Sequence, residues 1–111
     1  SGFVIDCDGQ VRAELHSNGY PLGVEAKTTY DDQPTLQLAS GEMVLMLTDG
    51  IAEAKSKSGE PFGAQRTLEL VRNCREQPAA AIINAIQAAA SGFCEAPNFE
   101  DDITAVVAKC L

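Results

Sequence analysis

The 111-residue chain has no tryptophan, little other aromatic content, one histidine, and half as many bases as acids. Eight lysines and arginines against sixteen aspartates and glutamates give a net charge of -8. Nucleic acid and anionic membranes both require basic side chains, so we expect neither as a partner. No apolar run approaches the roughly 18 residues typical of a membrane span, and we expect no membrane insertion. The length suits one globular domain with a buried core.

The cysteines have no CxxC spacing, which makes a zinc site a weak interpretation. Because they lie in or beside apolar segments, we expect small buried hydrophobic side chains in a reducing, cytoplasmic setting. The four are Cys7, Cys74, Cys94 and Cys110. The chain opens at Ser1 without a secretory pattern. Since the first residue is not Met, we expect a piece of a longer protein.

Short apolar segments between turn formers predict β-strands in the first half of the chain. Alternation on both sides of Asp8-Gly9 predicts a hairpin over residues 3–15. The five apolar residues from Met43 to Leu47 do not alternate, which predicts a central strand covered on both faces. Two further short strands are expected at residues 28–30 and 35–38, after a turn-rich loop.

The second half of the chain has helical periodicity. Residues 62–74 carry apolar side chains at helical spacing, and a second helix is expected from Pro78 to a stop at Gly92. Residues 51–60 are mixed and polar, and within them residues 55–59 are expected to form a solvated loop. Residues 103–108 are expected to form a last strand that is apolar on both faces. Strands, then two helices, then a strand predict an α+β domain rather than a βαβ array.

Acidic residues stand next to both of the most apolar strands. Asp49 follows the strand at 43–47, and Asp101-Asp102 precede the strand at 103–108. If these strands are antiparallel neighbours, the carboxylates converge, and their repulsion is relieved by a cation such as Mg²⁺ or Mn²⁺. The alternative is that Asp49-Gly50 is a turn and Asp101-Asp102 part of a solvated loop.

Five short segments occur in an order that is more specific than any of them alone. They are residues 19–23 (GYPLG), 40–42 (SGE), 47–54 (LTDGIAEA), 59–63 (GEPFG) and 101–107 (DDITAVV). Together they resemble the C-terminal half of a bacterial SpoIIE/RsbU-type serine phosphatase domain. That branch belongs to the metal-dependent protein phosphatases of the protein phosphatase 2C-type superfamily. The family usually has Asp where Glu42 stands.

The resemblance implies a fold, an activity and a set of site residues. The implied fold is a partial protein phosphatase 2C-like antiparallel β-sandwich with two flanking α-helices. Two Mn²⁺ or Mg²⁺ ions would be held by aspartates in the complete domain, and a metal-activated water would attack phosphoserine or phosphothreonine. By motif, Asp49 and Asp101 would be metal ligands, and Gly50, Asp102 and Thr104 would support them.

The resemblance also implies residues and partners outside this chain. Similar domains carry, in an upstream half, an aspartate that bridges the two metals and a further Asp-Gly-type motif, and no matching context is present here. We therefore expect weak divalent-metal binding and no activity from residues 1–111 alone. Related proteins dephosphorylate a phosphorylated anti-sigma-factor antagonist and are often fused to sensor or receiver domains.

Two other functions stay open at this point. One is a non-catalytic protein-binding module that retains the phosphatase fold, and the other is an acidic calcium-binding β-domain unrelated to phosphatases. If part of the domain is missing, sheet edge and apolar face are exposed, and pairing with a second copy would cover them. A homodimer is therefore also expected.

Overall fold

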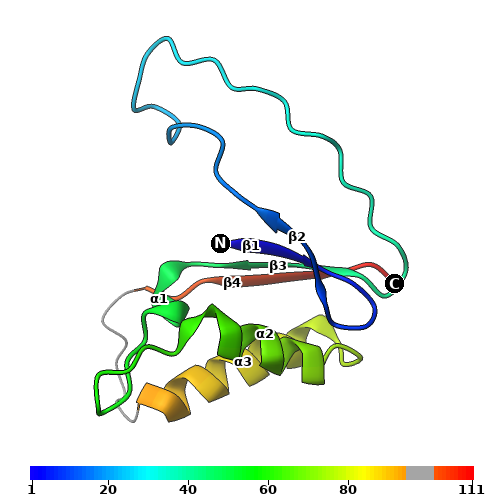
Figure 1. Ribbon diagram of the computed structural model, residues 1–111, viewed down its shortest axis with the longest axis vertical. Coiled ribbons are helices and arrows are strands. Elements are labelled where there is room, and N and C mark those ends of the chain that lie inside the picture. The colour runs from blue at the N-terminus through cyan, green and yellow to red at the C-terminus, as the bar shows by residue number, and fades with distance from the viewer. Residues whose placement is uncertain (95–101) are drawn as a thin grey trace.

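The computed structural model describes residues 1–94 and 102–111, which form one antiparallel sheet with helices against it (Figure 1). The sheet order is β2-β1-β3-β4. The elements are β1 (Gly2–Ile5), β2 (Val11–Leu15), β3 (Met43–Leu47), α1 (Asp49–Ala52), α2 (Gly63–Asn73), α3 (Ala79–Cys94) and β4 (Ala105–Lys109). The predicted α+β class is confirmed.

The predicted hairpin is formed by β1 and β2, and its turn is stabilised locally. The Asp6 carboxylate accepts hydrogen bonds from the backbone N–H groups of Asp8 and Gln10 at 3.0 and 2.8 Å. Gly9 has φ +85°, a backbone conformation that residues with a Cβ atom rarely adopt. The hairpin therefore follows from the local sequence, as expected.

The predicted central strand is also confirmed, because β3 lies between β1 and β4. Both neighbours are antiparallel to it, and the β3–β4 register runs from Met43 opposite Lys109 to Leu47 opposite Ala105. The end of β3 and the start of β4 consequently lie at the same end of the sheet. This topology places the candidate site.

Helices α2 and α3 pack on one face of the sheet and form the core with it (Figure 1). Alternate strand residues, among them Ile5, Met43 and Leu45, are almost fully buried against Ile82 and Ile86 of α3. Burial of such side chains is the main stabilising term of a fold this size. Among the described residues, no helix is long and apolar enough to cross a membrane.

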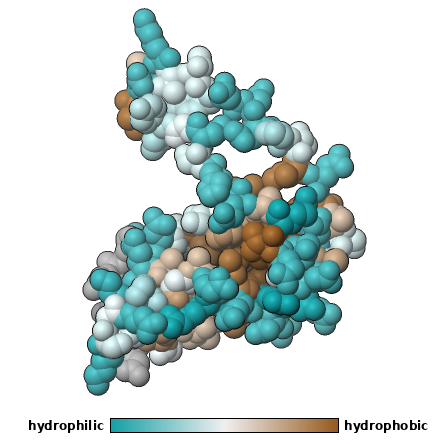
Figure 2. Space-filling model, in the orientation of Figure 1, coloured by the Kyte–Doolittle hydropathy of each residue, from teal (hydrophilic) through white to brown (hydrophobic). Residues whose placement is uncertain are grey.

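On the opposite face of the sheet, called here the open face, every paired position is apolar. The register places on it Gly2, Val4, Ala13, Leu15, Val44, Met46, Val106 and Ala108. Met46 and Val106 are each 51% exposed, and Figure 2 shows apolar side chains gathered over the strands. The expectation that β3 and β4 are covered on both faces is therefore wrong for Met46, Val106 and Ala108, which are exposed, although Val4 of the neighbouring β1 is buried on this face.

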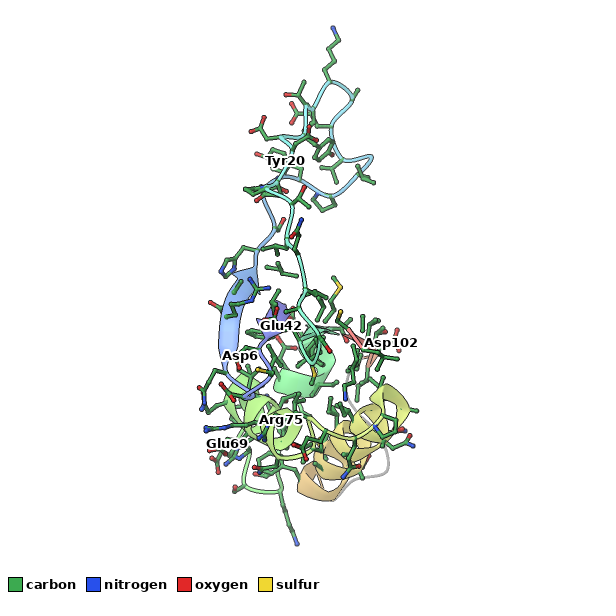
Figure 3. All side chains as sticks on the ribbon, turned by 90° about the vertical axis from the view of Figure 1, so that its right-hand side faces the viewer. Asp6, Tyr20, Glu42, Glu69, Arg75 and Asp102 are labelled. Atoms are coloured by element: carbon green, nitrogen blue, oxygen red, sulfur yellow. The ribbon has the colours of Figure 1, made fainter. Side chains whose placement is uncertain are left out.

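Two predicted strands are not formed. Residues 28–30 and 35–38 lie in a segment, residues 16–41, that has no regular strand and runs outward between β2 and β3 (Figure 1). Figure 3 shows Tyr20 far from the sheet on this segment, with Glu42 at its base. No neighbouring strand supplies ladder hydrogen bonds there, so local β propensity has nothing to pair with.

Two helix boundaries also differ from the sequence prediction. Gly92 lies inside α3, which continues to Cys94, because a single glycine in a helix costs only about 1 kcal/mol against the packing of its neighbours. Asp49 and Gly50 open the short helix α1, which the sequence did not predict, and Ile51 is buried in it. The polar stretch that follows closes on itself through a bridge between Lys55 and Pro61.

Candidate metal site at the end of β3 and β4

The segment that follows β3 and the segment that precedes β4 lie side by side at one end of the sheet. The backbone N–H of Thr48 donates to the Thr104 carbonyl at 2.9 Å, which extends the β3–β4 pairing beyond Leu47. Asp49 follows immediately as the first residue of α1, and Asp49 and Asp102 are both exposed. The antiparallel arrangement thus brings the two segments to one edge.

Gly50 also lies close to the segment that precedes β4. It is buried, and a Cβ atom built on it would overlap with the carbonyl oxygen of Asp102. The same Cβ would also contact the side chain of Ile103 at 3.4 Å. Only glycine allows α1 to approach the backbone before β4 this closely, which gives the Asp-Gly pair a structural reason beyond a turn.

The other predicted site residues fall on either side of this contact. Thr104 is exposed, and its backbone N–H and C=O both bond to Thr48. Asp101, predicted as a metal ligand, lies outside the described residues. The ligand role of Asp49 and the supporting roles of Gly50, Asp102 and Thr104 therefore stay predictions. The structure brings the backbones of these four residues to the same end of the sheet.

The donor chemistry at this edge suits a hard divalent cation. Asp49 and Asp102 carry carboxylates at this edge, beside backbone carbonyl oxygens, and these are the ligand types that Mg²⁺ and Mn²⁺ prefer. Within residues 1–94 and 102–111, no group of three or more His, Cys, Asp or Glu side chains could hold a metal ion. The described residues fit part of a coordination sphere rather than a whole one.

The sequence interpretation assigned no role to Thr48 or Glu42. Thr48 stands between β3 and α1. The sequence feature that could have identified it is a hydroxyl side chain at the point where an apolar strand ends. Glu42 lies before β3, at the other end of the strand, where its carboxylate binds the Arg12 guanidinium at 2.8 Å. This ion pair joins the start of β3 to β2, away from the candidate site.

A family model matches the entire chain. The model is Stage II sporulation protein E (SpoIIE), and the match runs over residues 1–111. The chain belongs to the SpoIIE family. SpoIIE members are serine/threonine phosphatases of the protein phosphatase 2C type, so the resemblance inferred from the ordered motifs is confirmed.

Two individual proteins are similar to this SpoIIE-family chain, one in sequence over part of it and the other in structure over nearly all of it. Protein IcfG of Synechocystis sp. is 33% identical over 67 residues, which are 60% of this chain and 10% of that protein. The solved SiaA-PP2C domain of Pseudomonas aeruginosa superposes with a TM-score of 0.72 at 23% identity, over 97% of this chain and 42% of that chain. The fold is therefore a partial protein phosphatase 2C-like fold, and the chain spans less than half of each similar protein.

Proposed function

We propose that this chain is the C-terminal part of a metal-dependent protein serine/threonine phosphatase domain. Membership of the SpoIIE family and the partial phosphatase fold support the class of enzyme. The proposed substrate is phosphoserine on a regulatory protein such as an anti-sigma-factor antagonist. The remainder of the domain, and a sensor or receiver domain, would belong to a longer cytoplasmic protein.

The observation that carries the proposal is the antiparallel pairing of β3 with β4. It places the Asp49 turn against the backbone of Asp102, with Gly50 at the contact. Two carboxylate-bearing segments, more than fifty residues apart in sequence, thereby share one exposed edge. An exposed edge is open to a phosphoprotein, which a buried carboxylate pair would not be.

Each residue has a defined task in the proposed site. Asp49, the first residue of α1, would supply one carboxylate ligand, and Asp101 would supply the second. Gly50 allows the close approach, while Asp102 and Thr104 orient the segment that carries Asp101. A Mn²⁺ or Mg²⁺ ion held by these aspartates would supply an activated water and would neutralise phosphate charge. Because the described residues offer only part of the ligand set, we expect weak binding and no turnover by the chain alone.

Titration of the 111-residue chain with Mn²⁺, followed by paramagnetic broadening of amide NMR signals, tests the proposal. We expect broadening to be centred on Thr48 to Ile51 and on residues around Asp102, at Mn²⁺ concentrations that suit a weak site. Asp49→Asn should abolish it. Asp8→Asn is the matched control, because Asp8 is exposed in the hairpin turn at the opposite end of the sheet.

Three results would contradict parts of the proposal. Broadening that is unaffected by Asp49→Asn would remove Asp49 from the ligand set. Tighter binding of Ca²⁺ than of Mn²⁺ would favour a calcium-binding domain. Hydrolysis of p-nitrophenyl phosphate by residues 1–111, abolished by Asp49→Asn, would disprove the expectation that the chain is inactive alone.

The open face favours a second candidate function, a non-catalytic protein-binding module. Met46 and Val106 are half exposed on that face, next to a groove that is also lined by Leu15 and Thr48. A protein surface that binds another protein commonly presents such an apolar patch. Absence of Mn²⁺ binding even in the longer protein would favour this function over catalysis.

A further inference from the structure

Thr48 occupies the junction between β3 and α1, and its backbone is committed to both elements. Its N–H donates to the Thr104 carbonyl at 2.9 Å, and its C=O accepts the N–H of Ile51 at 3.4 Å. The residue is extended, with φ -78° and ψ 160°, and its side chain makes no capping hydrogen bond to α1. The hydroxyl is therefore directed to another partner.

That partner is the segment leading into β4. The Thr48 hydroxyl oxygen accepts the N–H of Thr104 at 2.8 Å and lies 3.3 Å from the Thr104 carbonyl and 3.4 Å from the Asp102 carbonyl. A hydroxyl has one proton, so it donates to one of these carbonyls while it accepts from the amide. One side chain thus contacts the backbone at both Asp102 and Thr104.

The hydroxyl replaces a missing ladder hydrogen bond. In a regular antiparallel pair, Thr104 would donate to the Thr48 carbonyl in return for the bond that it accepts. Here the Thr48 carbonyl faces α1, and the hydroxyl takes its place. The strand pairing therefore continues to the residue before Asp49, while the chain already turns into the helix that carries Asp49.

We infer that Thr48 is a positioning residue, whose hydroxyl fixes the Asp49 carboxylate relative to the backbone around Asp102. The inference rests on the proposed function in one respect, that this edge binds a divalent cation. Such cations demand defined ligand geometry, so freedom between the two segments lowers affinity even when every ligand is present. Loss of a group that orients metal ligands typically costs about 10-fold or more in metal affinity.

If the Thr48 hydroxyl only stabilised the fold, its removal would lower stability and metal affinity together. Thr48 and Thr104 are both exposed, so water can satisfy the Thr104 amide when the hydroxyl is removed. Fold stability should then change little, whereas the orientation of the two segments is lost. Metal affinity and thermal stability are therefore expected to separate in variants at this position.

The experiment compares Thr48→Val with Thr48→Ser in the 111-residue chain, using the Mn²⁺ titration by NMR and the thermal midpoint. We expect Thr48→Val to weaken Mn²⁺ binding by about 10-fold or more, with faster exchange of the Thr104 amide, and Thr48→Ser to retain both properties. Thr35→Val makes the same substitution on the exposed outward segment and should change neither property.

Each outcome decides between the claims. If Thr48→Val binds Mn²⁺ like the unmodified chain while Asp49→Asn does not bind, this inference is overturned and the proposed function stands. If the unmodified chain shows no Mn²⁺ binding, this inference is overturned, and the same titration of the longer protein then decides the proposed function. Should Thr48→Val not fold, Thr48→Ser and Thr48→Ala differ by one oxygen atom, and equal Mn²⁺ affinity in that pair would likewise overturn the inference.

Discussion

Arg12 of β2 and Glu42, which precedes β3, form an ion pair at the base of the outward segment. Arg12 donates through Nε to Glu42 Oε2 at 2.8 Å and through Nη2 to the Gln37 carbonyl at 2.9 Å. Glu42 Oε1 also accepts the N–H of Ala39 at 2.8 Å. The Glu42 side chain is only 10% exposed, so the pair is partly shielded from water. Together these contacts fix the return of residues 37–39 to the sheet.

We expect Glu42→Ala to release this return segment. The Ala39 amide should exchange faster in hydrogen-exchange NMR, and stability should fall by about 1–3 kcal/mol because a hydrogen-bonded charged group is left without its partner. Glu42→Gln keeps one oxygen acceptor and should protect Ala39 better than alanine does. Glu25→Ala, farther out on the segment, is the control, and equal exchange in all variants would argue against the clamp.

Gly50→Ala should destabilise the fold, because the added Cβ would overlap with the Asp102 carbonyl oxygen. A clash against backbone is relieved only by moving α1 or the segment before β4, at about 1–3 kcal/mol. Urea unfolding measures the loss. The same substitution at Gly92 is the control, since nothing lies within 4 Å of a Cβ there. Gly92→Ala lies within a helix and should stabilise by about 0.5–1 kcal/mol, and similar destabilisation by both variants would disprove the contact.

The open face predicts self-association of the isolated chain. Its residues are apolar, and pairing with a second copy would remove Met46 and Val106 from water. Light scattering should report a mass that rises with concentration. Met46→Glu should keep the chain monomeric, because burying an unpaired charge is costly.

Leu22→Glu provides the matched control for self-association. Leu22 is 85% exposed on the outward segment, so the variant makes the same change of charge away from the sheet. It should associate like the unmodified chain. A strictly monomeric unmodified chain at high concentration would refute the homodimer.

Burial raises the pKa of the Cys74 thiol above its ordinary value of 9.0, although its backbone hydrogen bond and nearby Lys109 lower it in part. The folded state therefore keeps its proton at pH values where the unfolded chain loses it. By linkage, this contribution to stability is complete below the unfolded pKa and is lost as pH rises through the folded pKa. The free energy of unfolding should fall more steeply above pH 9 in the unmodified chain than in Cys74→Ala.

Cys7 serves as the comparison, because its side chain is exposed. Cys7→Ala should retain the steep alkaline loss of stability, and iodoacetamide should alkylate Cys7 well before Cys74. The same pH dependence in Cys74→Ala as in the unmodified chain would contradict the role of burial. The sequence analysis expected all four cysteines to be buried hydrophobic side chains, and the exposed position of Cys7 shows that this expectation was wrong for Cys7.

Local patterns were sufficient for the elements whose stability is local. The Asp8-Gly9 turn, the periodicity of α2 and α3, and the five apolar residues of β3 each carry their own signal, and each element is present. The strands expected at 28–30 and 35–38 were wrong because a strand is stable only when another strand pairs with it. Propensity alone does not disclose whether that partner is present.

For the candidate site, the sequence by itself determined the residue types and their order: Asp49-Gly50 after one apolar strand and Asp101-Asp102 before another. Only the tertiary structure decided that these strands are antiparallel neighbours, that Gly50 touches the Asp102 backbone, and that the Thr48 hydroxyl completes the ladder. The physical reason is that strand pairing and close backbone approach join residues far apart in the chain, so their energy depends on the whole fold and leaves no periodic trace in the sequence.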